Sequence, residues 1–160
     1  MKPNFNHVIF KKIRYKDNQV ILTYEDETPH GNDKYTMESF DEPAPEFKKA
    51  LSGLAPHVID ICELSNESPD NISVLGVSLS DTDGITGVTI TALKNLVRSN
   101  APLVLNTPHK PYESYTKDGD DSNCLTDDQI DAVETLVEAA RDYLRGKRAQ
   151  GDLFSTEEAA

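Results

Sequence analysis

The chain has 160 residues, a length that fits one domain at roughly 100–200 residues per domain. It holds 28 acidic and 16 basic residues, and the resulting formal net charge of −12 opposes coating of nucleic acid by bulk charge. Hydrophobic residues make up 37% of the chain, below the ~45–50% that is usual for globular proteins. We therefore expect one folded unit with a modest core.

The sequence lacks targeting signals and a disulfide pattern, and this predicts a cytoplasmic protein. No run approaches the roughly 18–20 apolar residues that a membrane span needs, and the first residues lack the apolar segment of a signal peptide. Cys62 and Cys124 are far apart in sequence and form neither a metal-binding CxxC pair nor a disulfide framework. We expect two free thiols, a cytoplasmic protein and no membrane partner.

The first third of the chain predicts three strands. Residues 7–15 and 19–24 are rich in Val, Ile, Phe and Tyr and flank a Lys-Asp-Asn turn, which is typical of a β-hairpin. Residues 34–40 predict a third strand after a loop with Pro29 and Gly31.

The first hairpin is basic, although the chain is acidic. Strict alternation of side chains would place Val8 and Phe10 on the same face as Lys12 and Arg14. The opposite face would then hold three other residues, Ile9, Ile13 and Tyr15. Neither predicted face is cleanly polar.

After Pro45 the apolar residues recur every three or four residues, which predicts an amphipathic helix. Its apolar stripe consists of Phe47, Leu51, Leu54, Val58 and Ile61 or Cys62. Pro43 and Pro45 suit the start of this helix, whereas Pro56 should kink it or split it into two short helices.

A second group of strands follows. Residues 72–80 and 85–93 alternate apolar residues with Ser and Thr around an Asp-Thr-Asp-Gly turn, which predicts another hairpin. Residues 103–106 predict one more strand, and residues 107–124 a polar loop.

The last predicted element is a helix that begins after Thr126. The Thr126-Asp-Asp-Gln129 segment fits a capping box, and a regular apolar stripe follows it. We expect this helix to end near Ala149, before Gly151. The predicted fold is α+β, with antiparallel strands in two hairpin or meander groups packed with two amphipathic helices. Residues 1–149 would form this domain, and residues 150–160 a flexible C-terminal tail.

Catalytic signals are lacking in the sequence. The four histidines have no metal-ligand spacing, and no glycine-rich phosphate loop or GxSxG serine motif occurs. Asp118, Asp120 and Asp121 lack the glycine and the glutamate that a calcium loop requires at fixed positions. We therefore predict no catalytic residues, no metal, no cofactor and no enzymatic activity; a small hydrolase with a distributed site is the remaining alternative.

The basic residues of the first hairpin predict a nucleic-acid site. The candidate residues are Lys11, Lys12, Arg14 and Lys16. With Phe10 and Tyr15 nearby, they could hold phosphates and stacked bases of a single strand. The alternative is that these charges protect the edge of a sheet against pairing with other chains.

A short motif near the end of the chain is more specific. Residues 150–154 read Gln-Gly-Asp-Leu-Phe. This pentapeptide resembles the clamp-binding motif by which bacterial polymerases, repair proteins and replication factors dock on the DNA polymerase sliding clamp. Gln150, Asp152, Leu153 and Phe154 match the motif, and Gly151 stands where Leu is commoner.

This resemblance implies a partner and a role. Leu153 and Phe154 would enter an apolar pocket of the clamp, and Gln150 would bind a second subsite. The chain would then be a non-enzymatic accessory factor of bacterial or phage DNA replication, repair or recombination. In the alternative arrangement, Leu153 and Phe154 fold back onto the core. The alternative function is an acidic protein-binding or inhibitory module, a DNA mimic directed at a host protein.

Overall fold

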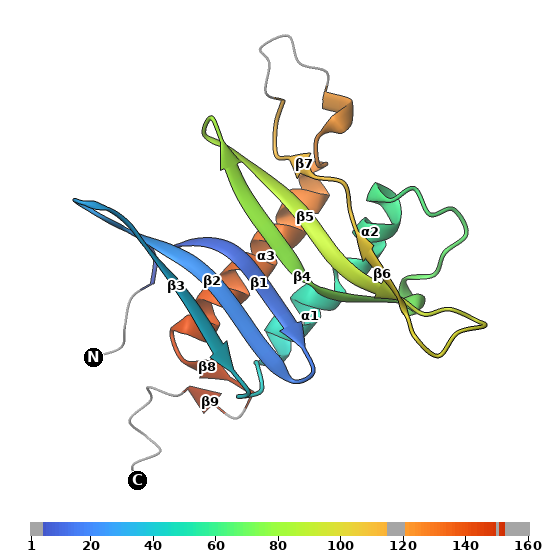
Figure 1. The fold of residues 1–160 in the computed structure, drawn as a ribbon, viewed down its shortest axis with the longest axis horizontal. Coiled ribbons are helices and arrows are strands. Elements are labelled where there is room, and N and C mark those ends of the chain that lie inside the picture. The colour runs from blue at the N-terminus through green and yellow to red at the C-terminus, as the bar shows by residue number, and fades with distance from the viewer. Residues whose placement is uncertain (1–4, 115–120, 150, 153–160) are drawn as a thin grey trace.

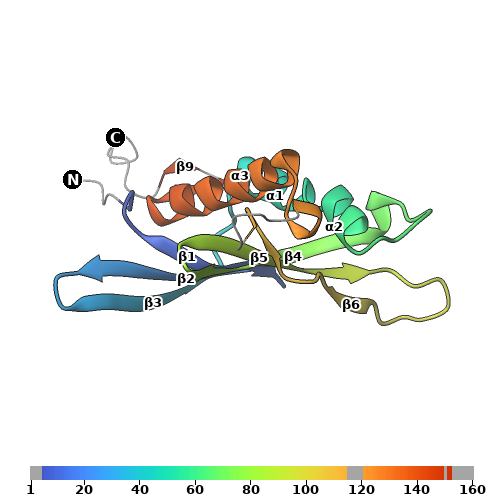
Figure 2. The ribbon, with the colours of Figure 1, turned by 90° about the horizontal axis from the view of Figure 1, so that it is seen from above.

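A computed structural model describes residues 5–114, 121–149 and 151–152 of the chain. The structure confirms the α+β class: helices cover one face of an antiparallel sheet, and no described helix or strand covers the opposite face (Figure 2). We call this uncovered side the open face.

The first meander and the first two helices follow the predicted order. Its strands are β1 (Ile9–Lys16), β2 (Gln19–Thr28) and β3 (Gly31–Ser39). Asp17 and Asn18, between β1 and β2, have φ values of 54° and 63°, as a tight hairpin turn of the type I′ class requires. The predicted helix is split, as expected at Pro56, into α1 (Pro45–Ser52) and α2 (Ala55–Ile61).

The second half of the chain adds another meander and the longest helix. Its elements are the 3-10 turn η1 (Pro69–Asn71), β4 (Ile72–Thr82), β5 (Ile85–Lys94), β6 (Leu103–Asn106), β7 (Lys110–Pro111), the 3-10 turn η2 (Asp121–Asn123) and α3 (Asp127–Leu144). The capping box is confirmed, since the Thr126 hydroxyl accepts from the Gln129 amide and the Gln129 side chain accepts from the Thr126 amide.

Both meanders belong to one sheet with the strand order β3-β2-β1-β4-β5-β6, and β7 pairs with β5 beside β6 (Figure 1). The junction between the meanders is short. Only Lys12, Ile13 and Arg14 of β1 pair with β4, opposite Ser78, Val77 and Gly76. Beyond these pairs the two strands diverge.

A β-bulge corrects the predicted faces of β1. Between Phe10 and Lys12 the register with β2 shifts by one residue, so Lys11 is the extra residue. Phe10 is therefore buried on the same side as Ile13, whereas Lys12 and Arg14 project from the opposite side. The strict alternation that grouped Phe10 with Lys12 was wrong because one inserted residue exchanges the faces.

The predicted end of the last helix was also wrong. Helix α3 ends at Leu144, five residues before Ala149. Gly146 has a φ of 108° and donates its amide to the Tyr143 carbonyl, so this glycine, and not Gly151, ends the helix. The chain then forms a small hairpin of β8 (Lys147–Arg148) and β9 (Gly151–Asp152), which crosses the predicted boundary between domain and tail.

The core lies between the sheet and the helices. Its side chains include a row across the sheet, Leu22, Ile13, Val77 and Ile90, each at most 2% exposed. Phe47 of α1 and Leu136 of α3 close the core from the helical side. Within the described ranges, no helix has both the length and the apolar character that crossing a membrane demands.

The position of Leu136 yields a first test. Its side chain is 0% exposed, so Leu136→Ala should create a cavity and lower the free energy of unfolding by about 2–5 kcal/mol. Urea melts measure this change. Thr135→Ala, on the exposed side of the same helix, is the control and should change stability by less than about 0.5 kcal/mol. Equal stability of both variants would contradict this placement of α3.

The junction of β1 and β4 yields a second test. A Cβ atom at Gly76 would collide with the Ile13 carbonyl oxygen and lie 2.8 Å from the Arg14 Cα. Gly76→Ala should therefore separate β1 from β4 and destabilise the protein by at least about 1–3 kcal/mol. Ser80→Ala, at an exposed position of β4, is the matched control. A thermal melt in which Gly76→Ala is as stable as the control would show that the junction tolerates a side chain.

Candidate binding surfaces

Three of the four predicted nucleic-acid residues lie together on the open face. Lys12, Arg14 and Lys16 alternate along β1 with Ile13 and Tyr15, which face the helices. Because β1 is paired on both sides, by β2 and by β4, it is an inner strand. The alternative that these charges protect a sheet edge is therefore wrong for Lys12 and Arg14, where β4 pairs with β1.

The surroundings of these cations are rich in hydroxyl groups. The strand registers place Lys12 in one row across the open face and Arg14 in the next. The Lys12 row consists of Thr36, Thr23, Lys12, Ser78 and Thr89. The Arg14 row consists of Glu38, Ile21, Arg14, Gly76, Thr91 and Asn106. Such a surface offers both charged and neutral hydrogen-bond donors.

The aromatic side chains expected beside the cations are on the other face. Phe10 is 3% exposed, and Tyr15 packs edge-on against Phe47 of α1 with a centroid distance of 6.2 Å. Tyr24 and Tyr35 stack on each other in register with Phe10, at 5.5 Å between centroids. These rings therefore belong to the helical side of the sheet and cannot stack bases held by Lys12 and Arg14.

Lys11 lies apart from the other three, in a groove where β1 and β4 diverge. The groove has a volume of about 210 Å³, and its wall includes Phe10, Leu79 and Val137. Lys11, Asp81, Glu134 and Arg141 add charged groups to its lining. The bulge explains this separation, because the extra residue turns away from the row of Lys12.

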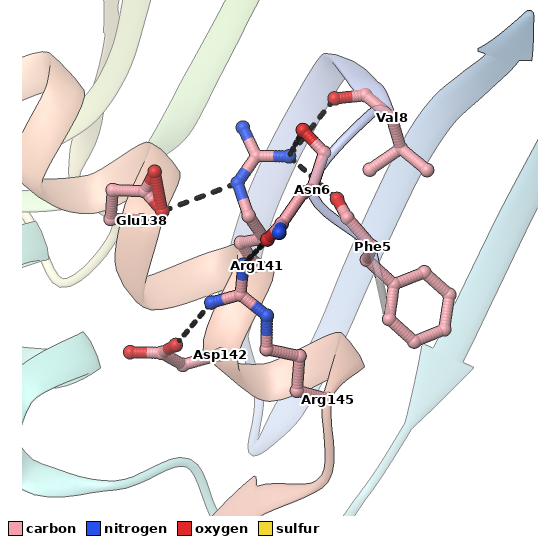
Figure 3. A network of polar contacts seen from close by, with 7 residues as sticks. All are labelled: Phe5, Asn6, Val8, Glu138, Arg141, Asp142 and Arg145. Atoms are coloured by element: carbon pink, nitrogen blue, oxygen red, sulfur yellow. Dashed lines mark hydrogen bonds and ion pairs between the residues drawn. The ribbon is translucent and has the colours of Figure 1, made fainter. Parts of the chain in front are cut away.

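Arg141 holds one side of this groove in place (Figure 3). Its Nη1 atom donates to the carbonyl oxygens of Phe5 (2.7 Å) and Val8 (3.1 Å), and its guanidinium carbon lies 5.5 Å from the centre of the Phe10 ring. Its Nε atom also pairs with Glu138 at 3.2 Å. Helix α3 thereby fixes the segment that leads into β1.

The opposite side of the groove is fixed by Tyr112. Its hydroxyl donates to Glu134 Oε2 at 3.0 Å. Burial raises the pKa of Tyr112 far above its ordinary value, and the Glu134 carboxylate raises it further. The phenol therefore stays protonated at neutral pH and acts as a hydrogen-bond donor.

Residues 5–114 and 121–149 contain no cluster of side chains that could bind a metal ion. In these ranges, no three His, Cys, Asp or Glu side chains come together as a metal ion would require. The thiols are partly buried, and burial raises the pKa of Cys62. Cys62 thus fits the packing role that its place in the apolar stripe indicated.

The C-terminal segment is attached to the body just before the clamp-like motif. The guanidinium of Arg148 lies 3.5 Å from the centre of the Tyr143 ring and donates to the Tyr143 carbonyl at 2.6 Å. The amide of Ala149 donates to the carbonyl of Glu42 at 2.9 Å. Asp152 of the motif is paired through its backbone with Lys147.

The remaining motif residues, Gln150, Leu153 and Phe154, lie outside the described residues. The structure therefore describes the attachment of the motif but not its two apolar side chains. Comparison of the chain with protein-family models, with curated proteins and with solved structures gave no match.

The network around Arg141 yields a third test. Arg141→Ala removes charged hydrogen bonds to two carbonyl groups and should lower the free energy of unfolding by about 2–3 kcal/mol. Glu138→Gln is the control, since the Glu138 side chain is 62% exposed and its ion pair should contribute less than about 1 kcal/mol. Equal losses of stability in denaturant melts of both variants would contradict this role of Arg141.

Proposed function

We propose that the chain is a non-enzymatic accessory factor of bacterial or phage DNA replication, repair or recombination, and that it docks on the DNA polymerase sliding clamp in the cytoplasm. The observation that carries this proposal is the motif of Gln150, Asp152, Leu153 and Phe154, which resembles clamp-binding peptides. Two apolar anchors and one amide give a short peptide most of its affinity for such a pocket.

The attachment of the motif supports this role. The residues just before the motif are joined to the body through the contacts of Arg148 and Ala149. The described pairing of Asp152 belongs to a two-residue strand, β9, which is short compared with the ladders of the main sheet. A clamp could therefore displace β9 without opening the core.

Binding to a purified bacterial sliding clamp tests the proposal. Calorimetry should give a dissociation constant on the order of micromolar, as expected for a short peptide that orders on binding. The double variant Leu153→Ala with Phe154→Ala should abolish binding, because both apolar anchors are lost.

The control for this experiment removes two exposed apolar side chains elsewhere. Leu96 and Val97 lie in the loop after β5, 39% and 101% exposed. Leu96→Ala with Val97→Ala should leave clamp binding intact, and both double variants should melt at the temperature of the parent protein. The proposal fails if the parent protein does not bind the clamp, or if the Leu153 and Phe154 variant unfolds because these residues belong to the core.

The acidic surface of the helical side favours the alternative function, a DNA mimic that binds a host protein, if clamp binding fails. Helix α3 alone carries six acidic residues, and a hollow between α1 and α3 is lined by Glu46, Asp131, Glu134, Glu138 and Asp142. Such a surface suits a basic protein partner, in the manner of a DNA mimic. Binding to a DNA-binding protein that DNA itself displaces would support this alternative.

A further inference from the structure

The open face keeps its cations free of acidic partners. Of the 14 Lys and Arg residues in the described ranges, six form ion pairs: Lys48, Lys94, Arg141, Arg145, Lys147 and Arg148. Lys12, Arg14 and Lys16 are among the eight that form none with a described residue, although acids outnumber bases 28 to 16 in the chain. These three cations lie in a line on one face of one strand, and such a line without acidic partners indicates a surface for an external anion.

The spacing of these cations fits a chain of anions. Lys12, Arg14 and Lys16 are alternate residues of one strand, so their Cα atoms are about 6.6–6.8 Å apart. Successive phosphates of an extended single strand of nucleic acid are separated by a similar distance. A single strand that runs along β1 could therefore place one phosphate near each cation.

Neutral donors lie on both sides of this line. Ser78 and Thr91 flank the cations on the β4 and β5 side, and Thr23 lies next to Lys12 on β2. Hydroxyl groups donate to phosphate oxygens in many nucleic-acid complexes and carry no sequence information. Because the neighbouring tyrosines face the helices, the surface can hold the backbone but offers no ring from β1, β2 or β3 for base stacking.

The acidic charge does not cancel this surface. The acids of α3 lie on the helical side, beyond the sheet and a helix about 10 Å wide, whereas charges in physiological salt are screened over about 8 Å. On the open face itself, Glu38 lies on β3 and Glu25 lies on β2 opposite Ile9, so neither stands between the cations. A local positive stripe therefore persists in a chain of net charge −12.

We infer that the open face binds the phosphodiester backbone of single-stranded nucleic acid along Lys12, Arg14 and Lys16, without preference for base sequence. This site is distinct from the described part of the clamp motif, because β9 lies on the helical side of the sheet (Figure 2). It excludes the earlier candidate Lys11, which lies in the groove.

Fluorescence anisotropy with a labelled oligothymidylate tests the inference on the full chain, without the clamp. Binding should be measurable at low salt, and three neutralised phosphates should give a slope of log affinity against log salt of about −2. Lys12→Gln with Arg14→Gln and Lys16→Gln should weaken binding at least about tenfold and bring the slope toward zero. A duplex of equal length should bind more weakly, because its phosphates do not follow one strand of the sheet.

A charge-matched variant on the helical side is the control. Lys48→Gln, Lys49→Gln and Lys147→Gln also remove three positive charges, but affinity should stay within about twofold of the parent. No binding at low salt, equal losses in both triple variants, or equal affinity for duplex would overturn the inference. The Leu153 and Phe154 double variant should bind the oligonucleotide normally, so failure of the clamp proposal and failure of this one are separable.

Discussion

The short junction between β1 and β4 is the constraint on which the rest of the structure depends. Three residue pairs join the two meanders into one sheet, and beyond them the strands separate. Gly76 is required there because a side chain would collide with the backbone of Ile13. So narrow a junction would be a weak hinge by itself, and the helical layer must hold the two halves of the sheet together.

Helix α3 supplies this support by contacting both halves of the chain. Gln129 at its start donates to Asp60 of α2 at 2.7 Å, Glu134 accepts from Tyr112 beyond β7, and Arg141 holds the segment before β1. Its apolar side packs on the core through Val133 and Leu136. The same helix places its acidic residues on the side remote from the open face. The position of α3 therefore both supports the core and separates these acidic residues from the cations of the open face.

The arrangement leaves two surfaces for two proposed partners. A clamp would bind at the C-terminal segment beyond α3, and a single strand of nucleic acid would lie on the opposite side of the sheet. Simultaneous binding would then need no change in the core. A factor with both surfaces could hold single-stranded DNA close to a replicating polymerase.

The sequence alone determined the order and the kind of the elements. Apolar periodicity, the Pro56 break and the Thr126 capping box act within a few residues, and so they predicted the six longer strands, the split helix and the start of α3 correctly. They did not predict the two-residue strands β7, β8 and β9. Tertiary structure decided what depends on distant partners. The bulge at Lys11, set by pairing with β2, exchanged the faces of β1 and moved Phe10 away from Lys12. The same bulge separates Lys11 from Lys12, Arg14 and Lys16. The inner position of β1 follows from β4, which is far away in sequence and which no local pattern could reveal.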